Sequence, residues 1–396
     1  MAAASLLAGT SESIHKGSQN EALAREQRFA SPPRYRYSAS RQSLVIMHSF
    51  TPRPEYAGLV AYRADRPHVE IDLGDSTNQW GIPPAALAAI SGLSPRAYSE
   101  YPPVESVRLV EAAARFFGVA PENVITGCGS DNVLDAAIRA LARPGDRLAH
   151  PAPTFAMVPV SARANGLVPV GVPVTPSGDV DAAAILATGA PIIYLCTPNN
   201  PSGVAHSRAA VERVVAEAPG VVIIDEAYAE FADECFTPLA AQHPHVLVTR
   251  TMSKAFGMAG LRVGFGIGSP PLVSEVVKAR GPYKVNAVAE AAATAALVSD
   301  QAWVAERAAA ARAARTRFES ALRSIGLAPI TSQANFVCVP VHDARAVAAQ
   351  LHARGIAVRP FAALPGIGDA LRIGLAPWPT LERVVAALRD VSSARA

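Results

Sequence analysis

Residues 253–257 read Ser-Lys-Ala-Phe-Gly, and residues 260–264 read Gly-Leu-Arg-Val-Gly. Lys254 follows closely on the apolar run at residues 246–248, so it lies near the end of a predicted strand with small residues beside it. A lysine held out of water in such a place has a lowered pKa, and its neutral amine can attack an aldehyde. The stretch therefore predicts a buried, nucleophilic lysine.

Groups that bind phosphate lie on both sides of this lysine. Thr251 and Ser253 carry hydroxyls, and Arg262 supplies a guanidinium eight positions beyond the lysine. Hydroxyls and an arginine fork are suitable donors to a phosphate. A lysine that can form a Schiff base next to a phosphate site indicates pyridoxal phosphate as the cofactor.

The composition is that of a globular protein and argues against several classes of protein. The 396 residues, half of them hydrophobic, suffice for two domains or for a large and a small one. The net charge of +3 at pH 7 is too small to indicate a nucleic-acid or membrane partner, and no apolar run approaches the ~18 residues of a membrane span. Four well-separated cysteines without a CxxC pair favour reduced thiols in the cytoplasm over disulfides or a metal site: Cys128, Cys196, Cys235 and Cys338.

The first 48 residues differ from the rest of the chain. They are rich in Ser, Arg, Gln and Glu and lack sustained apolar periodicity, so we expect a disordered extension, with Met47 as an alternative start. Glutamates at positions 12, 21 and 26 argue against an organellar targeting segment. Residues 49–98 are expected to form an N-terminal arm that contributes to a small domain.

From about residue 100, short apolar strands alternate with amphipathic helices. This pattern predicts a mostly parallel sheet covered by helices on both faces, in a large α/β domain at residues 99–290. The expected helices are 105–117, 130–142 and 209–218, and the expected strands are 167–174, 192–196, 221–224, 246–248 and 263–267.

The pattern changes in residues 291–396, which begin with a long helix rich in Ala and Arg. We expect a separate, smaller α+β domain here. Its predicted helices are 302–325, 344–354 and 381–391, and its predicted strands are 335–339, 356–359 and 371–373.

Candidate ligand groups lie where predicted strands end, which is the edge at which ligands bind in open α/β sheets. Residues 127–132 read Gly-Cys-Gly-Ser-Asp-Asn and lead into a helix. Free N–H groups at a helix N-terminus near Ser130 and Asp131 could hold a phosphate. Taken alone, this motif is better interpreted as an ordinary loop with a serine helix cap.

Two further strand ends carry polar side chains suited to a pyridine ring. Asn200, in a Pro-rich turn, could donate to a phenolate oxygen, although its neighbours are also typical of a simple turn. Asp225 could keep a pyridinium nitrogen protonated, so that the ring serves as an electron sink, and the adjacent Glu226 competes for this role. Tyr228 could donate to the ring's 3-oxygen or merely pack.

Two side chains could contact the ring and the substrate. Phe155 could stack on a planar ring, although a phenylalanine more often lies in the core. Arg372 is a cation in the apolar stretch at 371–373. A partly buried strand arginine could bind a substrate carboxylate or phosphate, or pair with a surface acid.

In this order the motifs resemble the class I and II aminotransferases of fold type I, and most closely the histidinol-phosphate aminotransferase branch. The resemblance covers roughly residues 52–392 and implies a large pyridoxal-phosphate domain, with a mostly parallel sheet of the seven-stranded type between helices, plus a smaller α+β C-terminal domain. It also implies a homodimer with shared active sites. The matching stretches are 197–203, 225–228, 250–256, 260–264, 332–337 and 355–359.

The resemblance implies roles in cofactor binding. Lys254 would be the Schiff-base lysine and proton shuttle. Asp225 would pair with the pyridine nitrogen, and Asn200 and Tyr228 would hold the 3-oxygen. Phe155 would stack on the ring. The cofactor phosphate would lie among hydroxyls, a helix start and a cation: Ser130, Asp131, Thr251, Ser253 and Arg262.

The resemblance also implies substrate contacts. Tyr101 matches a tyrosine that family members place in the site of the other subunit, next to cofactor and substrate. Arg372 matches the arginine that grips the substrate's acidic group, and Arg359 one that reads a distal phosphate. The arm departs from the family's Asn-x-Asn-Pro motif, since residues 76–81 read Ser-Thr-Asn-Gln-Trp-Gly, which puts Trp80 in a substrate-facing position.

The predicted function is transfer of an amino group between a histidinol-phosphate-like or aromatic donor and a 2-oxo acid such as 2-oxoglutarate, as in histidine and other amino-acid biosynthesis. A decarboxylating lyase of the threonine-phosphate type shares this framework and is one alternative. An aminotransferase of secondary metabolism is another, because the arm around Trp80 is altered. A regulator that senses the cofactor would need a DNA-binding module, and the short residues 1–48 argue against one.

Overall fold

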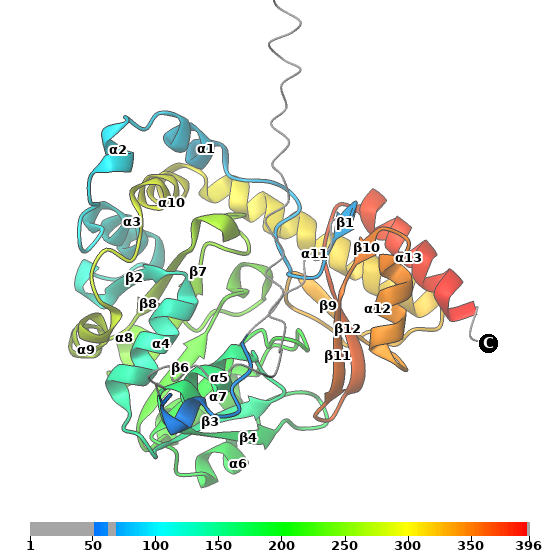
Figure 1. Cartoon of the computed structure of the whole chain (residues 1–396), viewed down its shortest axis with the longest axis horizontal. Coiled ribbons are helices and arrows are strands. Elements are labelled where there is room, and N and C mark those ends of the chain that lie inside the picture. The colour runs from blue at the N-terminus through cyan, green and yellow to red at the C-terminus, as the bar shows by residue number, and fades with distance from the viewer. Residues whose placement is uncertain (1–50, 62–68, 394–396) are drawn as a thin grey trace, which may run out of the picture. The chain divides into compact units, whose positions relative to one another are not determined.

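A seven-stranded sheet forms the centre of the structure, a computed structural model that describes residues 51–61 and 69–393 (Figure 1). The strand order is β2-β8-β7-β6-β5-β3-β4; β8 runs antiparallel to both neighbours, and the other pairs are parallel. The strands are β2 (Val124–Cys128), β3 (Arg147–Ala152), β4 (Val168–Pro173), β5 (Ile192–Cys196), β6 (Val221–Asp225), β7 (Val246–Thr251) and β8 (Val263–Ile267). The extension expected at residues 1–48, with its alternative start at Met47, lies outside the described residues.

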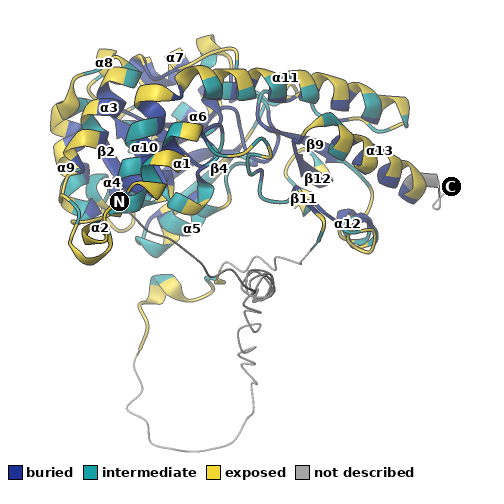
Figure 2. Cartoon of the chain, turned by 90° about the horizontal axis from the view of Figure 1, so that it is seen from above, coloured by how far each residue is buried: buried dark blue, intermediate teal, exposed yellow. Residues whose placement is uncertain are grey.

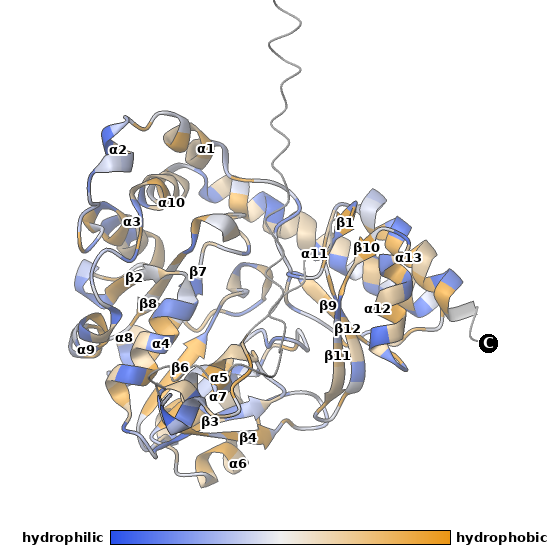
Figure 3. Cartoon of the chain, viewed as in Figure 1, coloured by the Kyte–Doolittle hydropathy of each residue, from blue (hydrophilic) through white to orange (hydrophobic). Residues whose placement is uncertain are grey.

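The central strands are apolar at successive positions because both faces of the sheet are covered. Ile223 packs into one core cluster and Ile224 into the other, as the alternation of side chains along a strand requires. Figure 3 shows β6 in the colour of hydrophobic residues, whereas the surrounding helices carry both hydrophobic and hydrophilic residues. The sequence prediction of a mostly parallel sheet between helices is confirmed.

Helices cover the sheet on both sides. The cluster around Ile223 includes side chains of α4 (Ser130–Leu141), α5 (Met157–Ala164) and α9 (Pro270–Arg280). The cluster around Ile224 includes side chains of α3 (Val107–Phe117), α6 (Ala182–Ala187), α7 (Arg208–Glu217), α8 (Leu239–Gln242) and α10 (Ala287–Ser299). The short helices α1 (Pro84–Ser91) and α2 (Arg96–Ser99) pack on α10.

Some strands differ from their prediction for local reasons. The predictions at 192–196 and 263–267 match β5 and β8. Strand β7 continues past the predicted 246–248 because its polar end is paired with β8, where Thr251 lies opposite Gly264. Strands β2 and β3 were not predicted, since Gly127 interrupts the apolar pattern of one and His150 and Pro151 that of the other.

The C-terminal part contains two smaller sheets. Strands β11 (Arg359–Leu364), β12 (Gly368–Gly374) and β9 (Phe336–Pro340) form an antiparallel sheet in that order. The arm strand β1 (Ile71–Asp72) pairs in parallel with β10 (Ile356–Ala357). The single strand predicted at 356–359 is therefore wrong: its first residues pair with the arm, and Arg359 begins a strand of the other sheet. Helices α12 (Ala344–His352) and α13 (Trp378–Ser393) accompany these sheets.

Helix α11 (Gln301–Ser324) runs from the end of α10 to the neighbourhood of β9 and α13, in both Figure 1 and Figure 2. Its outward face is exposed, whereas its inward face is buried at positions three or four residues apart, including Val304, Ala308, Ala311, Phe318 and Leu322. None of the helices in residues 51–61 and 69–393 is long and apolar enough to cross a membrane.

A close approach of two backbones fixes the start of α4. Gly264 on β8 lies so near the peptide of Gly129 and Ser130 that an added Cβ atom would collide with their main-chain atoms. Gly129 itself has a φ of 77°, in the region that favours glycine. These two glycines bring the N-terminus of α4 against the end of the sheet, beside the segment that carries Lys254.

Candidate functional site

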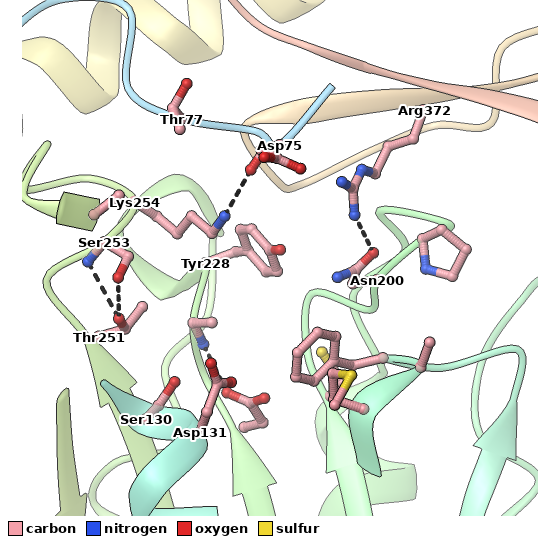
Figure 4. A pocket seen from close by; sticks show the side chains of 18 of the residues that line it. Asp75, Thr77, Ser130, Asp131, Asn200, Tyr228, Thr251, Ser253, Lys254 and Arg372 are labelled. Carbon is pink, nitrogen blue, oxygen red and sulfur yellow. Dashed lines mark hydrogen bonds between the residues drawn. The ribbon is translucent and has the colours of Figure 1, made fainter. Parts of the chain in front are cut away.

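A cavity of about 680 Å³ lies at the carboxyl ends of β5, β6 and β7 and is also lined by β11 and β12 (Figure 4). Strand ends of an α/β sheet are the usual place for a ligand. The cavity brings together most of the residues that the sequence marks as candidates: Ser130, Asp131, Phe155, Asn200, Asp225, Tyr228, Thr251, Ser253, Lys254, Arg262, Arg359 and Arg372.

The Lys254 side chain crosses the cavity toward the arm. Its Nζ donates to the carbonyl oxygens of Asp75, at 3.0 Å, and Ser76, at 3.4 Å. Burial lowers the pKa of Lys254 to about 8, and the positive charge of Arg372 acts in the same direction. A lowered pKa leaves more of the amine neutral near neutral pH, which is the form that attacks a carbonyl.

Below the lysine, donors converge on a space large enough for an anion. The Thr251 hydroxyl donates to Ser253 Oγ at 3.0 Å, and a nitrogen of Arg262 lies 3.4 Å from the same Oγ. The other terminal nitrogen of Arg262 donates to Asp131 at 3.3 Å. The N-terminus of α4 at Ser130 faces this group, because Gly264 permits the close approach described above. Hydroxyls, a guanidinium and a helix N-terminus together suit a phosphate.

Asp225 ends β6 and is buried at the wall of the cavity. Its carboxylate accepts hydrogen bonds from the hydroxyls of Tyr194, at 2.7 Å, and Thr249, at 3.1 Å, and from the backbone N–H of Ala227, at 3.2 Å. These three donors are neutral, so the burial of the charge prevails and raises the pKa of Asp225 to about 6. A cationic N–H in the cavity would stabilise this carboxylate.

The choice between Asp225 and Glu226 is resolved by the direction of their side chains. Glu226 points away from the cavity, accepts from the Thr237 hydroxyl at 2.7 Å, and lies 3.5 Å from a nitrogen of Arg250. The backbone N–H of Phe236 also donates to it. Asp225 is therefore the carboxylate that lines the cavity, and Glu226 belongs to a separate buried charge cluster.

Arg372 links the antiparallel sheet to the loop after β5. Its guanidinium donates to Oδ1 of Asn200 and to the carbonyl oxygen of Gly74, both at 2.7 Å. The rings of Phe336 and Phe361 lie 5.4 Å and 5.8 Å from it. Because Oδ1 of Asn200 accepts from Arg372, the amide is turned with its nitrogen away from that arginine, and this nitrogen can donate to a ligand in the cavity.

Arg359 is the direct cross-strand partner of Arg372 on β11. Directly opposite residues of an antiparallel pair project to the same face, and both arginines line the cavity. Phe155 and Met157 line it from the start of α5. The cavity thus has a cationic region next to an apolar wall.

Two predicted residues do not line this cavity. Tyr101 is 83% exposed, and its ring lies 4.8 Å from that of Tyr283. Trp80 packs against the core, and its backbone N–H donates to Asn78 Oδ1, while Asn78 donates to the carbonyl oxygen of Ala255. The Asn78 side chain thereby fixes the arm next to the lysine segment.

Several residues of the cavity and its surroundings were not found from the sequence. Asp75 and Thr77 line the cavity from the arm, where no strand or helix pattern precedes them. Tyr194 and Thr249 hold Asp225 from two neighbouring strands. Tyr194 offered one signal, as the only hydroxyl-bearing residue of β5, but the register places it opposite Ile223, and its partner Asp225 is evident only from the hydrogen bond itself.

Comparison with known proteins gives a consistent result. The family model for class I and II aminotransferases matches residues 69–388. The chain is 37% identical over 335 residues to a histidinol-phosphate aminotransferase of Roseiflexus castenholzii, covering 81% of this chain and 90% of the relative. It is 36% identical over 365 residues to one of Methylibium petroleiphilum, covering 89% and 94%. The solved histidinol-phosphate aminotransferase of Sinorhizobium meliloti with pyridoxal-5'-phosphate has a TM-score of 0.79 and 28% identity, with coverage of 89% and 100%.

The raised pKa of Asp225 predicts a pH-dependent stability difference. Between its ordinary pKa of 3.8 and its folded pKa of about 6, the folded protein holds the proton more tightly than the unfolded chain does. As pH rises through this window, ligand-free wild type should therefore lose up to about 3 kcal/mol relative to Asp225→Asn, which carries no charge there. Denaturant unfolding of both proteins at a series of pH values measures the difference. A difference that stays constant from pH 4 to 7 would contradict the burial of this charge.

Proposed function

Because this chain belongs to the class I and II aminotransferases and is a pyridoxal-phosphate-dependent transaminase, we propose that the cavity around Lys254 is its active site. The observation that carries the proposal is the convergence of a lysine of lowered pKa, a buried carboxylate and a phosphate-sized group of donors in one cavity. Lys254 would bind the cofactor's aldehyde through Nζ.

The residues fit the cofactor at three separate points. Asp225 is a buried carboxylate held only by neutral donors in its described hydrogen bonds, which suits a protonated ring nitrogen. Arg262 and Ser253 suit the phosphate. Asn200 can direct its amide nitrogen, and Tyr228 its hydroxyl, toward the ring's 3-oxygen. Burial raises the pKa of Tyr228, so that its hydroxyl keeps its proton and can donate it.

When bound, pyridoxal phosphate supplies an electron sink for the charge that develops at the substrate's α-carbon. Asp225 would hold the proton on the ring nitrogen. The amine of Lys254, once released, would accept the α-proton at Nζ and later return it, and its lowered pKa favours this general base role. Arg372 would bind the substrate's acidic group and orient the α-carbon toward the lysine.

For the substrates we propose a histidinol-phosphate-like or aromatic amino donor and a 2-oxo acid such as 2-oxoglutarate. The paired arginines at 359 and 372 support an acidic group at one end of the substrate. Met157 supports an apolar group beside it, while Phe155 would stack on the cofactor ring. The relatives named above are histidinol-phosphate aminotransferases, which supports a place in histidine biosynthesis. Release of carbon dioxide instead of amino transfer would indicate the lyase of the threonine-phosphate type.

We further propose that the enzyme is a homodimer whose subunits share their active sites. Tyr101 is highly exposed and outside the cavity of its own chain, which suits a residue that completes the site of a second copy. Other large apolar side chains are exposed nearby in the sequence, on α1, on α2, in the turn before α3 and at the start of α3: Leu87, Tyr98, Val104 and Val107. A contact surface of this kind is typical of oligomers.

The division of the chain follows from the same proposal. Residues 49–98 would form the arm, 99–290 the large cofactor domain and 291–396 the small domain. The pairing of β1 with β10 supports the assignment of the arm to the small domain. The four cysteines are free thiols, which supports a reducing, cytoplasmic location.

The role of Lys254 predicts a specific chemical label. Borohydride reduction of the holoenzyme should attach the cofactor covalently to the peptide that contains Lys254, as mass spectrometry can show. Lys254→Ala should lose this label and at least about a thousandfold in kcat, because both the attachment and the general base are removed. Lys278→Ala, at an exposed lysine on α9, is the control and should keep both. Labelling of another lysine in the wild type would overturn the assignment.

The role of Arg359 predicts a substrate-dependent change in KM. Arg359→Gln should raise KM for histidinol phosphate by about tenfold to a hundredfold, since a charge-assisted contact to phosphate is lost. KM for phenylalanine, which carries no phosphate, should change by less than about threefold. Steady-state kinetics with 2-oxoglutarate as acceptor measure both values. An equal rise for the two donors would exclude a role in phosphate recognition.

Shared active sites predict complementation between two inactive variants. Lys254→Ala and Tyr101→Ala homodimers should both have low activity, but a mixture refolded together should regain part of the wild-type activity. A mixed dimer holds one site with both residues intact and one site lacking both. Absence of any recovery, with mixed dimers demonstrated by differential tags, would contradict sharing through Tyr101.

A further inference from the structure

Residues 332–336 read Ser-Gln-Ala-Asn-Phe and end at the first residue of β9; we call them the junction segment. They contact the elements that form the site. The backbone N–H of Gln333 donates to the carbonyl oxygen of Gly203, at 2.7 Å, in the loop that carries Asn200. The Asn335 amide donates to the carbonyl oxygen of Ser76, at 2.9 Å, which also accepts from Lys254.

The last residue of the junction segment lies between two site residues. The Phe336 ring packs edge-on against the Tyr228 ring at 5.2 Å, and the Arg372 guanidinium lies 5.4 Å from its centre. Phe336 is fully buried, so its position is set by packing. The ring thus lies against both Tyr228, on the proposed cofactor side of the site, and Arg372, on the proposed substrate side.

Helix α11 holds the junction segment from behind. Glu319 accepts from the backbone N–H of Ser332 at 3.1 Å. One nitrogen of Arg315 donates to the carbonyl oxygen of Ala334 at 2.9 Å and to that of Phe231 at 3.3 Å. Phe231 ends the short 3-10 helix η3 (Ala229–Phe231), which starts immediately after Tyr228. A single guanidinium thus joins the segment after Tyr228 to the segment before Phe336.

The group that makes these hydrogen bonds is a buried charge. Arg315 is only 9% exposed, and burial lowers its pKa, while the negative charge of Glu319 opposes the shift. A charged donor in such a place makes strong hydrogen bonds, and its removal leaves carbonyl groups buried without their donor. The segment after η3 and the junction segment would then keep the bond from the backbone N–H of Asp233 to Oε1 of Gln333, at 2.9 Å, but lose the buried link between Phe231 and Ala334.

We propose that Arg315 is a positioning residue for substrate binding: it fixes the junction segment against η3, so that Phe336 holds Arg372 at the right distance from Tyr228. The inference rests on the proposed role of Arg372 as the group that binds the substrate's acid. Arg315 lies outside the lining of the cavity and acts only through the junction segment.

Arg312 provides a matched control on the same helix. It lies about one turn before Arg315, and its guanidinium donates to the carbonyl oxygen of Glu230 at 2.9 Å. This bond reaches η3 but not the junction segment. Substitution of Arg312 therefore removes a similar arginine from α11 while the link between η3 and Ala334 stays in place.

The experiment compares the holoenzymes of wild type, Arg315→Met, Arg315→Lys and Arg312→Met. Arg315→Met should raise KM for 2-oxoglutarate roughly tenfold, with kcat within about threefold and cofactor affinity and absorption spectrum within about twofold. Arg315→Lys keeps the charge and can donate to one carbonyl, so its KM for 2-oxoglutarate should lie between those of wild type and Arg315→Met. Arg312→Met should keep the wild-type KM. Equal KM values for all variants, or a loss of cofactor affinity as large as the rise in KM, would overturn the inference.

A second variant covers the case in which Arg315→Met does not fold. Phe336→Leu keeps the hydrogen bonds of Arg315 but removes the ring that lies against Tyr228 and Arg372. It should therefore raise KM for 2-oxoglutarate. An unchanged KM in Phe336→Leu would refute the positioning role.

If wild type shows no transamination, the proposed function is wrong, and this outcome does not depend on Arg315. Calorimetric binding of 2-oxoglutarate to wild type and to Arg315→Met then decides the positioning role, which predicts weaker binding to the variant.

Discussion

Successive side chains of a strand point to opposite faces, and the site depends on this rule at the ends of β6 and β7. On β7, Thr249 bonds Asp225 and Thr251 lines the cavity, whereas Arg250 between them turns to the other side. There it pairs with Glu226 and Glu230. One side of the strand ends is thus the cavity with the buried Asp225 carboxylate, and the other side is a buried ion cluster in which one arginine contacts two glutamates.

The burial of these strands also explains how much of the fold and of the site could be predicted from the sequence. The apolar runs predicted β5 and β8 because strands buried on both faces read as continuous hydrophobic stretches. The motifs around Lys254, Asp225 and Asn200 were recognisable because each follows such a run. Tyr194 was not, since a tyrosine inside an apolar strand gives no sign of the carboxylate across the sheet. Asp75 lies on the arm, whose position depends on long-range bonds such as that of Asn78 to the Ala255 carbonyl.

The C-terminal part shows a second limit of local patterns. Residues 356–359 look like one strand, yet they serve two sheets, because the arm strand β1 binds Ile356 and Ala357 while Arg359 pairs with Arg372. No local property of these four residues indicates that change of partner. As a result, Arg359 leaves the arm's sheet and lines the cavity beside Arg372.

This pairing of two arginines has a consequence for the energetics of the C-terminal sheet. Like charges directly opposite each other on neighbouring strands repel, and this repulsion opposes the pairing of β11 with β12 where they border the cavity. An anionic molecule bound between them would relieve that repulsion, and a ligand that binds only the folded state stabilises it by mass action. The substrate's acid would then also act as a structural counter-ion, and the C-terminal sheet would become firmer as the site fills.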